Sequence, residues 1–174
     1  MTDTLQERLV AALGAARERY PELTGVLVTL RFATATPLIQ AHLTRARNKS
    51  KRKYELRISS RYKTLLTQAQ GPALQGWFAR ELSKIYIYQK QNLIVLSLHK
   101  LHYLLSHNYK KKVERELDKD VIDRGLGTHL LAGRNAVLES DRVDELYKRA
   151  LHVYALSPRE ISSRAKTSKR AGRS

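Results

Sequence analysis

The feature that most constrains this chain is a long stretch in its middle with the pattern of a helix. Pro72 stands where a helix would begin, and Ala73–Tyr88 continues without a further proline. At 100° per residue, Arg80, Glu81 and Lys84 fall within an arc of about 100°. The adjoining side is apolar and consists of Leu74, Phe78, Leu82 and Ile85. The stretch therefore predicts a largely buried helix with one polar corner.

The segments around this helix predict an α+β fold that is mostly helical, with a small antiparallel or mixed sheet. Two stretches, Gly25–Phe32 and Tyr54–Ser59, alternate apolar and polar residues with the period of a strand. In the first, we expect one well-buried face made of Val26, Val28, Leu30 and Phe32. Apolar spacing and helix-ending residues predict further helices over Leu5–Tyr20, Asn92–Ser106, Tyr109–Arg124 with Gly125 as its stop, and Ser140–Tyr154.

The length and the apolar content predict one domain over residues 1–158. The chain has 174 residues, of which 42% are hydrophobic, which is enough for a single core. After Ser157 and Pro158 the sequence is rich in Arg, Lys and Ser, with Glu160 as its one acid and almost nothing apolar. We therefore expect residues 159–174 to form a basic, disordered tail.

The charge balance is strongly positive and predicts attraction to polyanions. Lys and Arg number 33 against 16 Asp and Glu, for a formal net charge of +17. Besides the tail, the cations cluster in a loop and at the start of a helix, at Arg45, Arg47, Lys49, Lys51, Arg52, Lys53, Lys110, Lys111 and Lys112. Such clusters suit a phosphate backbone and give little sequence selectivity. A solubilising role for these charges is the alternative.

Several classes of protein are excluded or disfavoured by what the sequence lacks. No cysteine is present, so disulfide frameworks, thiolate metal sites and cysteine nucleophiles are excluded. The most apolar stretch, Leu93–Leu105, is interrupted by His99, Lys100 and His102, and we expect no transmembrane segment. The first twenty residues resemble neither a secretory signal nor a transit peptide, so we expect a cytoplasmic protein.

A second helix carries two carboxylates inside an apolar stripe. Glu114 and Asp118 are one helical turn apart, and Leu117, Val121 and Ile122 flank them. Two buried carboxylates repel each other and lose hydration unless a cation meets them. The pattern therefore predicts a cationic partner for this pair.

These two helices together resemble the gluzincin-type, zincin-like zinc metallopeptidases. In that family a helix with His-Glu-x-x-His is followed some thirty residues later by Glu-x-x-x-Asp in a second helix. Here Gly76-Trp-Phe-Ala-Arg80-Glu81-Leu-Ser-Lys84-Ile85 is similar to the first, and Glu114-Arg-Glu-Leu-Asp118 to the second. The resemblance implies that Glu81 stands at the position of the general base, Glu114 at that of the third zinc ligand, and Asp118 at that of the acid that orients a ligand histidine.

Both positions that the resemblance assigns to zinc-ligating histidines are cationic. Arg80 has no lone pair to offer, and Lys84 would have to lose its proton to bind a metal. The resemblance therefore implies a degenerate member of the family, a pseudoenzyme without metal, cofactor or catalytic activity.

The exchange of histidines for cations predicts a salt-bridge cluster where the family holds zinc. Two neutral histidines with Zn²⁺ and the pair Arg80 and Lys84 both supply a charge of +2. We expect Arg80 to bind Glu114 with two hydrogen bonds and Lys84 to reach Asp118. The alternative is that both cations face solvent on an ordinary helix.

Two functions of different classes remain open at this point. The leading expectation is a catalytically inactive metallopeptidase-like protein whose cleft binds an unknown peptide or protein partner. The alternative is a basic, nucleic-acid-associated protein that uses the same fold only as a scaffold.

Overall fold

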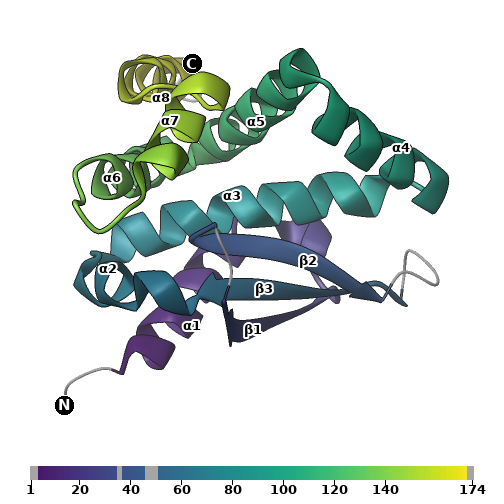
Figure 1. Ribbon diagram of the computed structural model, residues 1–174, viewed down its shortest axis with the longest axis horizontal. Coiled ribbons are helices and arrows are strands. Elements are labelled where there is room, and N and C mark those ends of the chain that lie inside the picture. Colours follow the sequence, from purple (N-terminus) through teal and green to yellow (C-terminus); the bar gives the residue numbers. More distant parts are fainter. Residues whose placement is uncertain (1–3, 35–36, 46–50, 172–174) are drawn as a thin grey trace.

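Helix α3 (Gly71–Lys90) lies at the centre of the computed structural model, which describes residues 4–34, 37–45 and 51–171. Figure 1 shows it between the sheet on one side and the helices α5 to α8 on the other. Pro72 lies in its first turn, as the sequence predicts, where a missing N–H leaves no backbone hydrogen bond unmade. Strand β2 (Ile39–Arg45) and helices α5 (His107–Val121) and α6 (Gly127–Leu138) pack directly against this helix.

Beneath α3 lies a mixed sheet that, among the described residues, has three strands. These are β1 (Leu27–Ala33), β2 (Ile39–Arg45) and β3 (Lys53–Ser59), in the order β1-β3-β2. β1 runs parallel to β3, and β2 runs antiparallel to it. The fold is thus α+β with a small mixed sheet, which confirms the predicted class.

Strand burial agrees with the sequence pattern in β3 and departs from it in β1. Tyr54, Leu56 and Ile58 are buried on one side of β3, the central strand. In β1, Val28 and Leu30 are only half-buried and Phe32 is 43% exposed. The predicted well-buried face is therefore wrong, because β1 is an edge strand and an open cavity lies between its residues 28–32 and the N-terminal helix.

The remaining helices differ from the predicted set by three additions. They are α1 (Leu5–Arg17), α2 (Lys63–Gln68), α4 (Leu93–Leu105), α5 (His107–Val121), α6 (Gly127–Leu138), α7 (Glu145–Tyr154) and α8 (Pro158–Ala171), with short 3-10 segments η1 (Pro21–Leu23) and η3 (Ser60–Tyr62) and the π-helical segment η4 (Ile122–Leu126). The additions are α2, α6 and α8. At Gly125, the predicted helix stop, the backbone takes φ 81°, a left-handed conformation that favours glycine.

Helix α8 contradicts the predicted disordered tail as far as residue 171; residues 172–174 lie outside the described part. Ser157 and Glu160 cap its start reciprocally, with Ser157 N donating to Glu160 Oε2 at 2.8 Å and Glu160 N to Ser157 Oγ at 3.3 Å. One turn apart, Ile161 (0% exposed) and Ala165 (9% exposed) bury an apolar side against α6 and η4. Two apolar residues one turn apart and a helix cap are thus enough to form and pack this helix despite its basic composition.

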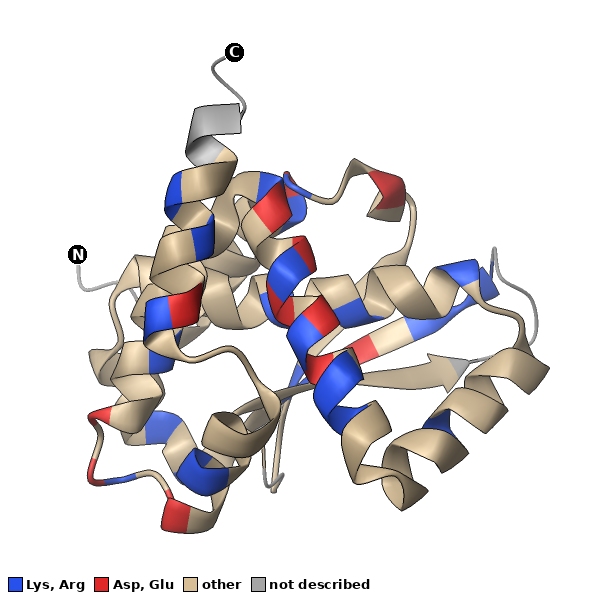
Figure 2. Cartoon of the chain, turned by 90° about the horizontal axis from the view of Figure 1, so that it is seen from above, with Lys and Arg blue, Asp and Glu red and all other residues tan. Residues whose placement is uncertain are grey.

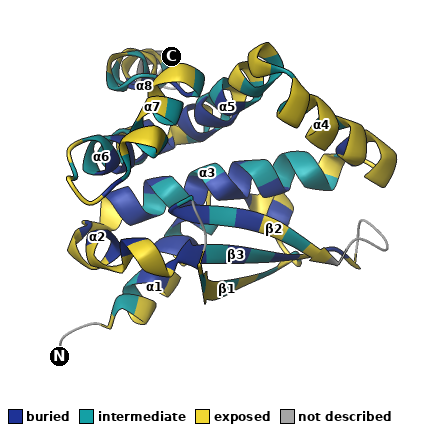
Figure 3. Cartoon of the chain, in the orientation of Figure 1, coloured by how far each residue is buried: buried dark blue, intermediate teal, exposed yellow. Residues whose placement is uncertain are grey.

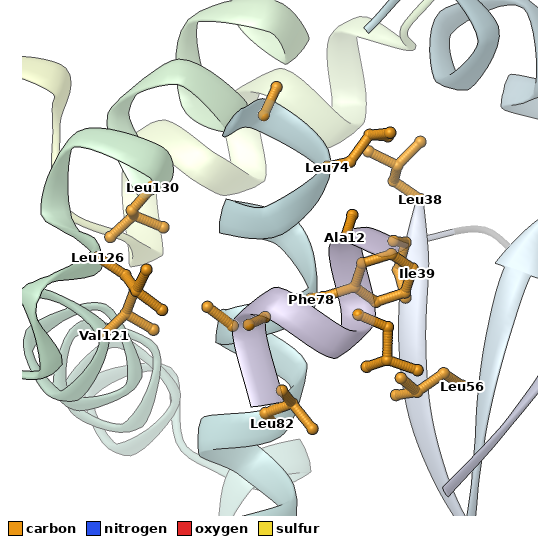
Figure 4. Packing of buried hydrophobic residues seen from close by; sticks show 14 of the residues in the cluster. Ala12, Leu38, Ile39, Leu56, Leu74, Phe78, Leu82, Val121, Leu126 and Leu130 are labelled. Atoms are coloured by element: carbon orange, nitrogen blue, oxygen red, sulfur yellow. The ribbon is translucent and has the colours of Figure 1, made fainter. Parts of the chain in front are cut away.

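The core lies on both sides of α3. Phe78 points toward α1 and the sheet, while Val121, Leu126 and Leu130 cover the other side (Figure 4). Close approach of α6 depends on Gly76, where an added Cβ would lie 2.2 Å from the carbonyl oxygen of His129. Within the described residues, no helix is long and apolar enough to cross a membrane.

Candidate functional site

The polar corner of α3 faces two carboxylates on α5. Arg80, Glu81 and Lys84 project from α3, and Glu114 and Asp118 from α5, so the structure brings all five sequence-selected residues together. We call them, with Arg134, the ion-pair cluster. Glu81, Asp118 and Arg134 are at most 5% exposed and Glu114 is 9% exposed. The cluster is therefore an interior feature and not a patch on the surface.

Arg80 bridges the two carboxylates of α5 instead of binding one of them with both nitrogens. Its Nε donates to Asp118 Oδ1 at 2.8 Å, and its Nη2 donates to Glu114 Oε2. The expected two-bond pairing with Glu114 alone is therefore wrong. Because Nε and Nη2 of the guanidinium each carry a donor, one side chain spans both acids that stand one turn apart on α5.

Lys84 pairs with Glu81 on its own helix and not with Asp118 as predicted. Its Nζ lies 3.0 Å from Oε1 and 2.9 Å from Oε2 of Glu81. The same carboxylate accepts a hydrogen bond of 2.6 Å from the backbone N–H of Ala41. Glu81, at the position of the family's general base, thus joins strand β2 to α3 and holds Lys84.

Asp118 has a second cationic partner that the sequence analysis did not select. Arg134 of α6 donates from Nη2 to Asp118 Oδ2 at 2.8 Å, and Leu156 N donates to the same oxygen at 2.8 Å. The sequence contains a sign of this role, because the spacing of Leu130, Arg134 and Val137 places all three on one side of a helix, and Leu130 and Val137 are buried. A cation within a buried stripe indicates a buried acid elsewhere in the fold.

Within the described residues the cluster balances its charges. Three cations, Arg80, Lys84 and Arg134, meet three carboxylates, Glu81, Glu114 and Asp118. Removing one partner from such a set leaves an uncompensated buried charge, which costs about 3–5 kcal/mol. Neutrality through Arg134 explains how the three acids remain buried.

The charges of Glu114 and Lys84 are stabilised by their neighbours. Burial alone would raise the pKa of Glu114, but the charges of Arg80 and Lys84 and the hydroxyl of Tyr103 outweigh it and lower the pKa to about 2. Burial would lower the pKa of Lys84, but Glu81 and Glu114 outweigh it and raise the pKa above its usual value. Glu114 is therefore a carboxylate, and Lys84 an ammonium, at neutral pH.

This donor set does not fit zinc. Arg80 offers no lone pair, and the ammonium of Lys84 has none while it stays protonated. Glu114 is engaged by Arg80 and by the hydroxyl of Tyr103. Among the described residues, no three His, Cys, Asp or Glu side chains are grouped so that they could hold a metal ion. The residues at the positions that the resemblance assigns to zinc binding therefore lack the donor groups that zinc requires.

Two cavities of similar size in the described part adjoin Lys84 and Glu114, which line both together with Gln40 and Tyr103. The first, of about 280 Å³, is enclosed by β2, α3, α4 and α5 and has a mainly apolar wall. The second, of about 290 Å³, lies between the start of β2, α3 and α7. Each is the size of a small ligand site. The two cavities lie next to each other, with Lys84 and Glu114 in the wall that they share, and we call them together the cleft.

The second cavity has an aromatic and cationic rim. Tyr147 and Tyr154 line it from α7, and the Nζ of Lys110 lies 4.2 Å from the centroid of the Tyr154 ring. Tyr154 also shares a hydrogen bond of 2.9 Å with His107 Nδ1. The rim is thus held in place from α5 as well as from α7.

The basic residues selected from the sequence do not form one surface. Arg52 is 3% exposed and donates from Nη1 to the carbonyl oxygen of Tyr88, so it is a buried structural residue and not a contact for nucleic acid. Lys110 is half-buried, while the remaining described members are exposed: Lys51, Lys53, Lys111 and Lys112. Arg47, Lys49 and the side chain of Arg45 lie outside the described residues.

Comparison with known proteins assigns no family to the chain. No protein-family model, no curated protein and no solved structure matches it. The chemistry of the site therefore has to be derived from its own residues.

Proposed function

We propose that this protein is a catalytically inactive, metallopeptidase-like domain that binds a peptide or protein segment in the cleft beside the ion-pair cluster. The observation that carries the proposal is the bridge from Arg80 to Glu114 and Asp118. It occupies the acids to which the resemblance assigns a zinc ligand and its orienting partner.

Support for the absence of catalysis comes from the engagement of Glu81. A general base needs a free lone pair directed at a water molecule or a substrate. Both carboxylate oxygens of Glu81 contact Lys84 Nζ, and one also accepts from Ala41 N. Those contacts stabilise the carboxylate as part of the fold.

Support for peptide binding comes from the shape and lining of the cleft. The two cavities are separated by a shared wall, so they suit two side chains of one extended segment. Their linings combine apolar and tyrosine side chains with a few charged groups, which is the composition of sites that bind organic ligands. Gln40, on the edge strand β2, lines both cavities and offers polar contacts along that segment.

The metal part of the proposal is tested by restoring the family's ligands. Zinc on the purified wild-type chain should stay far below one equivalent, whereas the double substitution Arg80→His and Lys84→His should bind about one equivalent through both new histidines and Glu114. Asp118 would then orient the histidine at position 80. A matched control, Lys63→His with Thr67→His, places the same spacing on the exposed side of α2 and should bind zinc much more weakly.

Either of two results would contradict this part. Stoichiometric zinc on the wild type that is lost on Glu114→Gln would show a metal site despite Arg80. A folded double variant that binds no more zinc than the α2 control would show that the geometry is unrelated to a metallopeptidase centre.

The binding part is tested with a displayed library of random peptides against the full chain. Selected peptides should bind the wild type, and Ala150→Trp, which fills the second cavity, should weaken them by about tenfold or more. The control Val153→Trp lies on the exposed side of the same helix and should leave the affinity unchanged. Equal affinities for the two variants would place peptide binding outside this cleft.

The exposed lysines at the start of α5 favour a second proposal, weak binding to a nucleic-acid backbone. Lys111 and Lys112 are exposed and follow Lys110. Affinity for unrelated DNA and RNA duplexes should then fall steeply as salt rises, and Lys111→Glu with Lys112→Glu should flatten that dependence. Undetectable binding at low salt would remove this second proposal.

A further inference from the structure

Helix α4 exposes more apolar surface than it buries. Of its thirteen residues, all of which the structure describes, Leu96 is the one that is buried. Its large apolar side chains that are at least 40% exposed are Leu93, Ile94, Val95, Leu98, Leu101, Leu104 and Leu105. Figure 3 shows the resulting exposed helix at the end of the molecule. A stretch of this size on a folded protein indicates a contact surface.

The exposed side chains are arranged on one side of the helix. Ile94, Leu98, Leu101 and Leu105 follow a four-three-four spacing, which places them within about 60° of one another around the helix axis. Their exposed fractions are 74%, 52%, 50% and 76%. They form a stripe along the full length of α4 that points away from α3 and α5.

The sequence around this stripe carries cations and no acid. No Asp or Glu occurs from Leu82 to Val113 or from Leu23 to Tyr54. Lys100 is exposed on α4 itself, and Lys111 and Lys112 are exposed in the helix that follows after one residue. In Figure 2 the α4 helix and the adjoining start of α5 show blue segments and no red until further along α5.

We propose that α4 is an interfacial helix that lays its leucine stripe into the surface of an anionic lipid bilayer. Apolar side chains enter the boundary between headgroups and acyl chains, and the lysines beside them contact the anionic headgroups. Thirteen residues correspond to about 20 Å of helix, which suits a position in the membrane plane and is too short to cross a bilayer. Ile94, Leu98, Leu101 and Leu105 line neither cavity of the proposed peptide cleft, so this inference does not rest on that cleft.

The positive charge around α4 favours an anionic bilayer over a second copy of the chain and over a nucleic acid. A second copy of the chain would bring the lysines next to α4 against their own counterparts, and the like charges would repel. A nucleic acid would match the lysines, but its phosphates would leave the leucine stripe in water. An anionic bilayer is complementary to both the charge and the apolar side chains.

The test is sedimentation of the full chain with lipid vesicles. Vesicles with about 30% phosphatidylserine in phosphatidylcholine should bind the protein, and pure phosphatidylcholine should bind it markedly less. The triple substitution Leu98→Gln, Leu101→Gln and Leu105→Gln should weaken binding to the anionic vesicles by about tenfold or more, because it removes the apolar contact. Since these residues are at least half exposed, the melting temperature should stay close to that of the wild type.

A matched control separates the stripe from exposed apolar residues in general. Val10→Gln, Leu27→Gln and Leu146→Gln change exposed apolar residues on α1, β1 and α7 and should leave vesicle binding unchanged. In addition, Leu105→Trp places an indole on the stripe, and its emission should shift to shorter wavelength with anionic vesicles and be quenched by brominated lipids.

Three results would overturn the proposal. The first is no binding to anionic vesicles at low salt. The second is binding that the leucine variant retains in full while duplex DNA competes for it, which would make the attraction purely electrostatic. The third is a dimer in solution that the leucine variant dissociates, which would identify a second copy as the occupant of the stripe.

Discussion

Arg80 satisfies two carboxylates of the same helix with two nitrogens of one planar group. Glu114 and Asp118 are a turn apart on α5, and a guanidinium can donate to both without leaving either carboxylate buried and unpaired. A lysine at this position offers a compact charge on a flexible stem and would not fix both acids at once. The identity of this residue therefore determines how α3 and α5 meet.

The depressed pKa of Glu114 makes a signed prediction about acid stability. Its pKa is lowered from 4.5 to about 2 in the folded protein. A carboxyl with a lower pKa in the folded than in the unfolded state stabilises fully above about pH 4.5, and this stabilisation is lost as the pH falls toward 2. We expect Glu114→Gln to lower the free energy of unfolding at pH 7 on the order of 3 kcal/mol, and this difference to shrink steadily below about pH 4.5.

Urea unfolding of wild type and variant at a series of pH values between about 7 and 3 measures this difference. Glu116→Gln is the matched control, because Glu116 lies on the same helix with its side chain 53% exposed and pairs with Lys119. Its effect should be small at every pH. A difference for Glu114→Gln that stays constant with pH would contradict the ionised, paired carboxylate.

Part of the cluster can be predicted from the sequence, and part depends on how α6 is placed. The spacing of Arg80, Lys84, Glu114 and Asp118 was enough to expect that they meet. Their pairing was not, because a lysine stem reaches an acid one turn away as easily as an acid on another helix. Arg134 belongs to the cluster because of the way α6 crosses α3. No local pattern around Asp118 predicts that crossing.

At the scale of elements, the contact between α3 and α6 depends on the absence of side chains. A Cβ at Gly76 would lie 2.2 Å from the carbonyl oxygen of His129 and 2.8 Å from the backbone nitrogen of Leu130. Both neighbours are backbone atoms of α6, so the helix as a whole would have to move. The distance between α3 and α6 also places Arg134 against Asp118.

We therefore expect Gly76→Ala to destabilise the fold by about 1–3 kcal/mol or more, although alanine favours helix better than glycine. Thermal and urea unfolding measure the effect. Gly14→Ala, in α1, is the matched control: nothing lies within 4 Å of its added Cβ, and it should stabilise the protein by about 0.5–1 kcal/mol. Stabilisation by both substitutions would refute the close crossing of the two helices.

The elements that the sequence analysis missed are those whose patterns are weak. In β2, Ile39 and Leu43 alternate with polar residues, but Ala41 and His42 between them are poor strand signals. The apolar residues of α6 are distributed around the helix instead of along one side, because α6 packs against both α3 and α8. The long helix α3 and the central strand β3 were predictable because each buries one well-marked side.

At the scale of the whole molecule, the boundary of the folded body lies beyond the predicted end at residue 158. Ile161 is fully buried against the domain, and Arg115 of α5 donates to Glu160 Oε1 at 2.5 Å. Composition alone suggested a solvated tail, since most residues of α8 are polar or basic. A helix can pack against a domain through a single apolar stripe. The overall composition of the segment does not reveal such a stripe, because the polar residues on the other sides outnumber it.

Ile161→Ala should accordingly cost about 2–5 kcal/mol of unfolding free energy, as expected for a buried isoleucine. Arg164→Ala, on the exposed side of the same helix, should change it by less than about 0.5 kcal/mol. Urea unfolding compares the two variants. Equally small effects would mean that α8 contributes nothing to the stability of the domain.

The partners of Asp118 lie far apart along the chain, which has a consequence for the order of folding during translation. Arg80 leaves the ribosome before Asp118, but Arg134 and Leu156 N follow it by 16 and 38 positions. A nascent chain that ends at α5 thus holds an acid it can neither bury nor neutralise fully. The nascent chain should remain open around α5 until α6 and the residues after α7 have been synthesised, and then close in a single late step.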